Sequence, residues 1–111
     1  MDFKQMYQEK LVSAEKAASV IKSGDWVDYG WTTATPVAVD KAIAKRLPEL
    51  TDVNFRGGIL MWVPEIFKIE NPAEHMTWNS WHMGGIERKA LAQGFSYYAP
   101  ILSLIHISEP T

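Results

Sequence analysis

A strand, a polar loop and the start of a helix follow one another directly between residues 26 and 37, in the segment Trp26-Val27-Asp28-Tyr29-Gly30-Trp31-Thr32-Thr33-Ala34-Thr35-Pro36-Val37. Residues 26–29 are predicted to form a short strand, and Gly30 opens a polar loop. Thr35 is predicted as the N-cap of the next helix and Pro36 as its first residue, where the missing N–H of proline costs nothing. This helix ends at Pro48. A strand, a loop and a helix in this order form the first half of a βαβ unit.

The same alternation continues along the rest of the chain. Further strands are predicted over residues 53–56, 76–78 and 95–98. Helical segments are predicted over residues 2–10, 64–67 and 86–92, and another helix begins after Ser13, a good N-cap, with Ala14, Ala17, Ala18 and Ile21 on its apolar face. Strands that alternate with helices at this spacing favour an α/β fold. We therefore predict an open, mainly parallel sheet with flanking helices.

The composition is that of a globular chain, and it argues against several classes of function. Of 111 residues, 47% are hydrophobic and 22% are charged; the net charge is −2, and Lys and Arg form no basic stripe that would predict nucleic-acid binding. The absence of cysteine excludes disulfides, Cys-based metal sites and a Cys nucleophile. The N-terminus is polar, and the longest strongly apolar run, residues 59–63, is far shorter than the ~20 residues of a membrane span. We expect a cytoplasmic protein with no membrane partner.

The last ten residues differ in character from everything before them. They read Leu102-Ser103-Leu104-Ile105-His106-Ile107-Ser108-Glu109-Pro110-Thr111, which resembles the translation of a common transposase sequencing adapter codon by codon. The alternative is a native C-terminal strand, because residues 102–107 alternate in polarity. We expect residues 102–111 to be non-native read-through, which would cut the native sequence near Ile101.

Two loops are candidates for a functional site. Residues 30–36 lie between a strand and a helix N-terminus, where ligands gather in open α/β sheets because the helix end offers free N–H groups. Residues 78–85 combine aromatic, amide and imidazole side chains in a loop before a helix. A simple turn in the first case, and a packed aromatic cluster with a capping Asn in the second, are the alternatives.

Other polar residues give weaker signals. His75 and His82, with Glu74 and Glu87 nearby, are separated by a strand and a loop, so their spacing does not favour a metal site and none is predicted. Glu65 is a carboxylate among apolar neighbours. It is either an acid with a perturbed pKa or, as we favour, an exposed residue in the first turn of a helix.

Several blocks of sequence together resemble the acetyl-CoA hydrolase/transferase family, and most closely its butyryl-CoA:acetate CoA-transferases from anaerobic bacteria. The resemblance covers residues 1 to about 100, and residues 77–83 are its most specific part. The blocks are Lys22-Ser23-Gly24-Asp25-Trp26-Val27-Asp28-Tyr29-Gly30, Thr35-Pro36, Arg56-Gly57-Gly58-Ile59-Leu60-Met61-Trp62-Val63-Pro64-Glu65-Ile66-Phe67, Thr77-Trp78-Asn79-Ser80-Trp81-His82-Met83 and Gly85-Ile86-Glu87-Arg88-Lys89.

The resemblance implies that residues 1–101 are part of the N-terminal domain of a two-domain CoA-transferase. In that family a glutamate carboxylate attacks an acyl-CoA thioester, and CoA is carried as a glutamyl-CoA thioester to an acceptor acid such as acetate. CoA is a substrate, and no cofactor is implied. The nucleophile lies downstream in the family, so none of Glu9, Glu15, Glu49, Glu65, Glu70, Glu74 and Glu87 takes that role, and this chain alone is expected to be inactive.

The family's N-terminal domain forms one wall of the active site, so we assign substrate binding to the two candidate loops. The residues chosen, by loop position, are Gly30, Trp31, Thr32, Thr33, Asn79 and His82. The expected partners are acyl-CoA, with butyryl-CoA favoured, and a short-chain carboxylate such as acetate; a homo-oligomer of the full-length protein stays open. Two alternatives remain: an acyl-CoA hydrolase of the same fold, and a non-catalytic α/β binding module.

Overall fold

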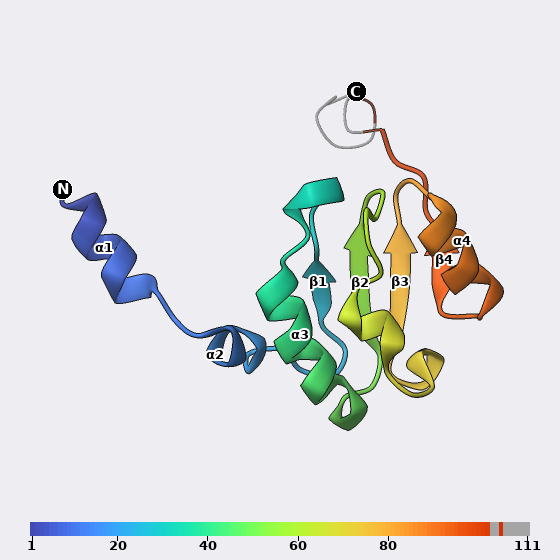
Figure 1. The fold of residues 1–111 in the computed structure, drawn as a ribbon, viewed down its shortest axis with the longest axis horizontal. Coiled ribbons are helices and arrows are strands. Elements are labelled where there is room, and N and C mark those ends of the chain that lie inside the picture. Colours follow the sequence, from blue (N-terminus) through green and yellow to red (C-terminus); the bar gives the residue numbers. More distant parts are fainter. Residues whose placement is uncertain (103–104, 106–111) are drawn as a thin grey trace.

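Four parallel strands form one sheet in the computed structural model of the chain, which describes residues 1–102 and residue 105. The strands follow one another across the sheet in the order in which they occur in the sequence (Figure 1). This confirms the predicted open parallel sheet. The strands are β1 (Trp26–Asp28), β2 (Val53–Gly57), β3 (Met76–Ser80) and β4 (Ser96–Tyr98).

Helical segments connect the strands, and two further helices precede the sheet. A helix lies between β1 and β2 and another between β3 and β4, whereas β2 and β3 are joined by a long connection with two 3-10 turns. The α-helices are α1 (Phe3–Lys10), α2 (Ala14–Ala18), α3 (Val37–Arg46) and α4 (Gly85–Ala92). The 3-10 helices are η1 (Thr32–Ala34), η2 (Leu47–Glu49), η3 (Glu65–Lys68) and η4 (Pro72–Glu74).

The structure confirms Ser13 as the N-cap of α2, whereas α1 begins at Phe3 instead of the predicted Asp2, and the start of α3 also differs from the prediction. The side chains of Asp2 and Ser13 accept hydrogen bonds from backbone N–H groups in the first turns of α1 and α2. In α3, Pro36 occupies the N-cap position instead of Thr35, so the predicted start was wrong by one residue. The reason is local, because the Thr35 hydroxyl donates a hydrogen bond to the carbonyl oxygen of Thr32 at 3.0 Å and so closes η1.

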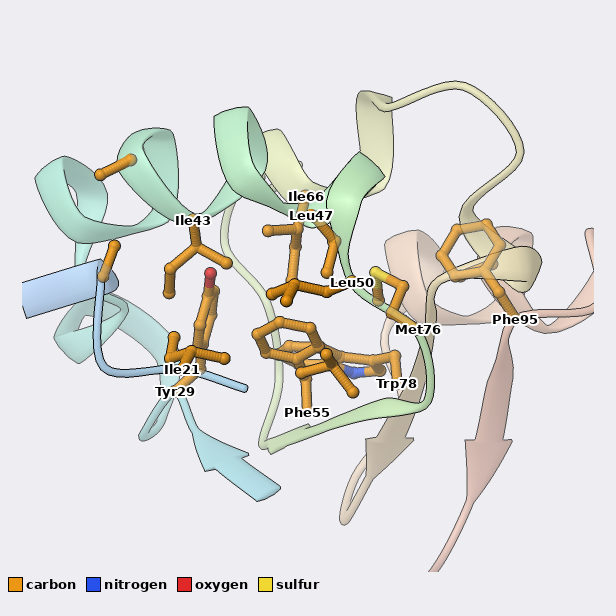
Figure 2. Close-up of a cluster of buried hydrophobic side chains, with 14 of the residues drawn as sticks. Ile21, Tyr29, Ile43, Leu47, Leu50, Phe55, Ile66, Met76, Trp78 and Phe95 are labelled. Atoms are coloured by element: carbon orange, nitrogen blue, oxygen red, sulfur yellow. The ribbon is translucent and has the colours of Figure 1, made fainter. Parts of the chain in front are cut away.

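The core lies between the sheet and the layer of helices that contains α3 (Figure 2). Cross-strand register places Val27, Phe55 and Trp78 side by side on one face of the sheet. Phe55 and Trp78 are fully buried, and Tyr29 meets both rings edge-on at centroid distances of 5.4 and 5.6 Å. Such edge-to-face contacts add to the stabilisation from apolar burial.

The opposite face of the sheet carries polar and exposed side chains. One cross-strand row on this face consists of Asp28, Arg56, Asn79 and Tyr97. Trp26 lies on the same face of β1, two residues before Asp28. Trp26 and Tyr97 are 62% and 64% exposed, respectively. We call this surface, defined by these five residues, the open face. Right-handed crossovers that always advance in one direction place their helices on one side of a parallel sheet, which explains the asymmetry.

Across the described residues, no helix has the length and apolar character needed to cross a membrane. The expected adapter read-through falls almost entirely outside the described residues, since only residues 102 and 105 of that segment are described.

Candidate functional site at the carboxyl edge of the sheet

Three loops meet where β1, β2 and β3 end. The N–H of Gly58 donates to the carbonyl oxygen of Gly30 at 3.2 Å, and the N–H of Thr32 donates to that of Ile59 at 3.1 Å. On the other side of β2, the N–H of Trp81 donates to the carbonyl oxygen of Gly57 at 2.9 Å. The parallel pairing therefore continues past the ends of the strands and holds the loops after all three strands together.

Trp31 forms the centre of this edge. Its ring centroid lies 5.0 Å from that of His82 and 5.8 Å from that of Trp81. The indole also lies against the backbone of Gly58, where a Cβ atom would come within 2.1 Å of the ring. Glycine at position 58 is therefore required by the close approach of Trp31.

A charged pair borders the aromatic group. The Nε atom of Arg56 lies 2.9 Å from an Asp28 carboxylate oxygen, and the Arg56 guanidinium carbon lies 5.4 Å from the centroid of the Trp81 ring. The other Asp28 oxygen accepts a hydrogen bond from the N–H of Gly30 at 2.8 Å, and Gly30 has a φ of +69°. This positive φ favours glycine and turns the chain out of β1. Asp28 thus links the open face to the first loop.

The six residues assigned to substrate binding are brought together only in part. Gly30, Trp31, Thr32 and His82 all contribute to the contacts at this edge, and Thr33 is an exposed residue of η1 beside them. Asn79 differs from the prediction, which placed it in a loop after a strand ending at Trp78. In the structure β3 continues to Ser80. Asn79 is therefore a strand residue whose side-chain amide donates to the Phe55 carbonyl oxygen at 3.1 Å, and it caps no helix.

The other polar residues singled out in the sequence lie apart from one another. The Nδ1 atom of His75 is 2.8 Å from the carbonyl oxygen of Leu50, and His75 precedes β3 whereas His82 follows it, so the two imidazoles lie at opposite ends of the strand. Glu65 begins η3 and pairs with Lys68 at 2.8 Å, which agrees with the interpretation as a first-turn residue. Among the described residues, no three His, Asp or Glu side chains are grouped so as to hold a metal ion.

Two buried carboxylates were not predicted as structural groups. Glu87 accepts hydrogen bonds from the N–H groups of Leu60 and Gly84, at 2.6 and 2.9 Å. The signal for Glu87 was present, because a glutamate three residues after an N-cap is half of a capping box. Asp40 could have been found from its spacing, since it shares a face of the helix with Ile43 and Leu47.

Asp40 is a buried residue of α3 that faces the end of β1 and the start of η3. It accepts a hydrogen bond from the Tyr29 hydroxyl at 2.9 Å and others from the N–H groups of Glu65 and Ile66, at 2.7 and 3.3 Å. Burial, and then the neighbouring Asp40 charge, raise the pKa of Tyr29 far above its ordinary range. Tyr29 is therefore held neutral as a hydrogen-bond donor that fixes the end of β1.

The edge offers surfaces for binding more than for covalent chemistry. The aromatic rings of Trp31, Trp81 and His82 are each half-buried, and clustered rings of this kind accept flat or apolar groups. The hydroxyl of Ser80 donates to the His82 carbonyl oxygen at 2.8 Å, and both Glu87 oxygens accept backbone N–H groups. These two groups are therefore occupied in holding the loops.

The sequence was compared with models of protein families and with curated proteins, and the matches agree on one family. The family model described as "Acetyl-CoA hydrolase/transferase N-terminal domain" matches residues 1–108. A curated butyryl-CoA:acetate CoA-transferase of Anaerostipes caccae is 63% identical over 101 residues, which cover 91% of this chain and 23% of that protein. A probable butyrate:acetyl-CoA coenzyme A-transferase of Syntrophomonas wolfei is 41% identical over 91 residues, 82% of this chain and 20% of that protein. The chain thus spans about a quarter of the length of these relatives.

Solved structures agree on the fold. The crystal structure of RipA from Yersinia pestis superposes with a TM-score of 0.74 at 24% identity, over 95% of this chain and 28% of that one. The structure of a RipA point mutant gives a TM-score of 0.78 at 23% identity, over 97% of this chain and 28% of that chain. At this identity the similarity supports the fold alone.

Proposed function

The chain belongs to the acetyl-CoA hydrolase/transferase family, and from this membership we propose that the protein it represents transfers CoA from an acyl-CoA, with butyryl-CoA favoured, to acetate. The observation that carries the proposal is the 63% identity to a butyryl-CoA:acetate CoA-transferase over 91% of the chain. The second relative, at 41% identity, is named for CoA transfer between acetyl-CoA and butyrate, which is the same exchange in the opposite direction.

In the proposed reaction a glutamate carboxylate attacks the thioester carbonyl and expels CoA as a thiolate, which forms a mixed anhydride. The thiolate then attacks the glutamyl carbonyl of this anhydride, releases butyrate and leaves a glutamyl-CoA thioester. Acetate reverses the sequence and leaves as acetyl-CoA. We place the nucleophilic glutamate in the part of the relatives that this chain does not span.

The carboxyl edge of the sheet is the part of this chain that we propose to contribute to the site. Ligands bind at the carboxyl ends of the strands in open α/β sheets, and this is where Gly30, Trp31, Thr32, Thr33 and His82 lie. Asn79 stays in the proposal as a neighbour on β3, although its amide already bonds to the backbone of β2. These residues form a wall that binds acyl-CoA and supplies no nucleophile.

The test is an assay of the full-length enzyme, encoded by an unbroken reading frame that begins with this sequence. We expect acetyl-CoA to form from butyryl-CoA only when acetate is present. Release of free CoA at the same rate without acetate would identify an acyl-CoA hydrolase, the alternative that the family description includes. Absence of both activities would contradict the proposal and favour a binding module.

The same reading frame tests the proposed boundary. We propose that native sequence ends near Ile101 and that residues 102–111 are adapter read-through, so genomic sequence should depart from this chain after residue 101. The 111-residue chain assayed alone should not transfer CoA, and measurable turnover would show that the nucleophile lies within it. The cytoplasmic location and a homo-oligomeric full-length protein stay predictions.

A further inference from the structure

Glu87 is a carboxylate in an unusual place. It is fully buried near the start of α4, and its two oxygens are used by two different loops. One oxygen accepts from the N–H of Leu60 in the loop after β2, and the other accepts from the N–H of Gly84 in the loop after β3. The N-terminus of α4 favours the negative charge, because its free N–H groups carry partial positive charge.

A continuous path runs from Glu87 to the aromatic group at the carboxyl edge. Leu60 follows Ile59, whose carbonyl oxygen accepts from the N–H of Thr32 in the loop after β1. On the other side, Gly84 lies two residues after His82, whose ring contacts Trp31 at a tilted angle. Glu87 therefore determines where the second and third loops stand relative to each other, and both contact the loop that carries Trp31.

We propose that Glu87 is a positioning residue for substrate binding, which holds the Trp31 and His82 rings in register across three loops. The inference rests on the proposed function, since it assigns the carboxyl edge to acyl-CoA. Neutral glutamine cannot replace the carboxylate, because a side-chain amide has one acceptor oxygen and its NH₂ group would face one of the two N–H donors.

The experiment compares two variants of the full-length enzyme. Glu87→Gln removes one of the two loop contacts. Arg46→Met is the control. Arg46 is the last residue of α3 and donates hydrogen bonds to the backbone carbonyls of Ala18 and Ile21, away from the three loops. Methionine keeps an apolar side chain of similar length but cannot make these hydrogen bonds. Measurements are kcat and KM for butyryl-CoA, thermal stability, and hydrogen exchange of peptides that cover residues 30–36 and 58–64.

We expect Glu87→Gln to lower kcat/KM by about 10- to 100-fold, mainly by raising KM, because small displacements of positioning groups are costly. Exchange should speed up in residues 30–36 as well as 58–64, although Glu87 does not touch the former. Arg46→Met should lower thermal stability and leave KM unchanged. An unchanged KM in Glu87→Gln, or faster exchange confined to residues 58–64, would overturn the inference.

Two further outcomes keep the inference separate from the proposed function. If the unmodified enzyme transfers no CoA, the proposed function fails, while the exchange of residues 30–36 still decides the role of Glu87. If Glu87→Gln does not fold, Glu87→Asp takes its place, since a carboxylate one methylene shorter cannot reach both amides. A wild-type KM and wild-type exchange in Glu87→Asp would then overturn the inference.

Discussion

At the scale of single residues, the carboxyl edge depends on side chains whose neighbours come from distant parts of the sequence. Gly58 is a glycine because Trp31 lies on it, and Asp40 is buried because Tyr29 and two backbone N–H groups satisfy it. Buried polar groups are retained when every hydrogen bond is made, and they become costly when one partner is removed. Substitutions at such residues should therefore have effects well above those of surface changes.

Gly58→Ala should move Trp31 away from its present contact. A Cβ at position 58 would lie 2.1 Å from a ring atom of Trp31, so the indole must shift, and overpacking of this kind costs about 1–3 kcal/mol. Urea unfolding of the chain measures the loss. Gly85→Ala is the matched control, because its Cβ would meet nothing within 4 Å and should be neutral or slightly stabilising. Equal stabilities for the two variants would contradict the close approach of Trp31.

Tyr29 should make stability depend on pH in the alkaline range. Burial and Asp40 raise the pKa of Tyr29 in the folded chain, whereas in the unfolded chain its ordinary value is about 10. A group whose pKa is raised by folding contributes its stability fully below the unfolded value and loses it above, because only the unfolded chain can ionise. The free energy of unfolding of the wild-type chain should therefore fall by up to about 1.4 kcal/mol per pH unit above pH ~10, because of Tyr29 alone.

Tyr29→Phe isolates that contribution. Below pH ~10 the variant should be less stable than wild type by about 1 kcal/mol, because the hydroxyl that bonds to Asp40 is lost. Above pH ~10 the difference should shrink, since the phenyl ring of the variant cannot ionise in either state. Urea unfolding of both chains across this range measures the difference, and a constant gap between the two curves would argue against the buried, neutral Tyr29.

At the scale of elements, local sequence signals predicted most of the architecture. Ser13 and Asp2 start helices because their side chains reach N–H groups two or three residues later, which needs no distant partner. The end of β3 was missed because it is set by pairing, since Ser80 continues the ladder opposite Gly57. Thr35 failed as an N-cap because its hydroxyl had a competing acceptor in the preceding turn. The contacts between loops that build the candidate site join residues far apart in the sequence, such as Gly30 with Gly58, and no local pattern encodes them.

The first helix illustrates an element that contributes little to this sheet. Every residue of α1 is exposed, and the helix projects away from the strands (Figure 1). An isolated helix of this length is marginal in water. Deleting residues 1–10 should therefore change the free energy of unfolding by no more than about 0.5 kcal/mol.

Ile21→Ala gives the contrast. Ile21 follows α2 and belongs to the buried core, so truncating its side chain should cost about 2 kcal/mol or more. Both changes are measured by urea unfolding of the chain. A larger loss from deleting α1 than from Ile21→Ala would mean that the helix packs on the sheet in solution.

At the scale of the whole molecule, the exposed open face is the feature that suggests a role for the further sequence of the longer relatives. Parallel sheets are usually covered on both faces, yet here one face shows Trp26 and Tyr97 more than half exposed at opposite edges. Exposed aromatic side chains that share one face of a sheet favour association with other surfaces. The chain is also about a quarter of the length of its relatives, which leaves ample further sequence in those proteins to cover such a face.

The 111-residue chain on its own should therefore self-associate through the open face. Replacing both aromatic residues, in the variant Trp26→Lys with Tyr97→Lys, adds charge to the face and should increase the fraction that elutes as monomer in size-exclusion chromatography. Tyr7→Lys with Val20→Lys is the matched control, because these side chains are 60% and 68% exposed but lie on and after the N-terminal helices. Equal gains in monomer from both pairs would mean that association follows total exposed apolar area, and no gain from the first pair would mean that the open face does not mediate it.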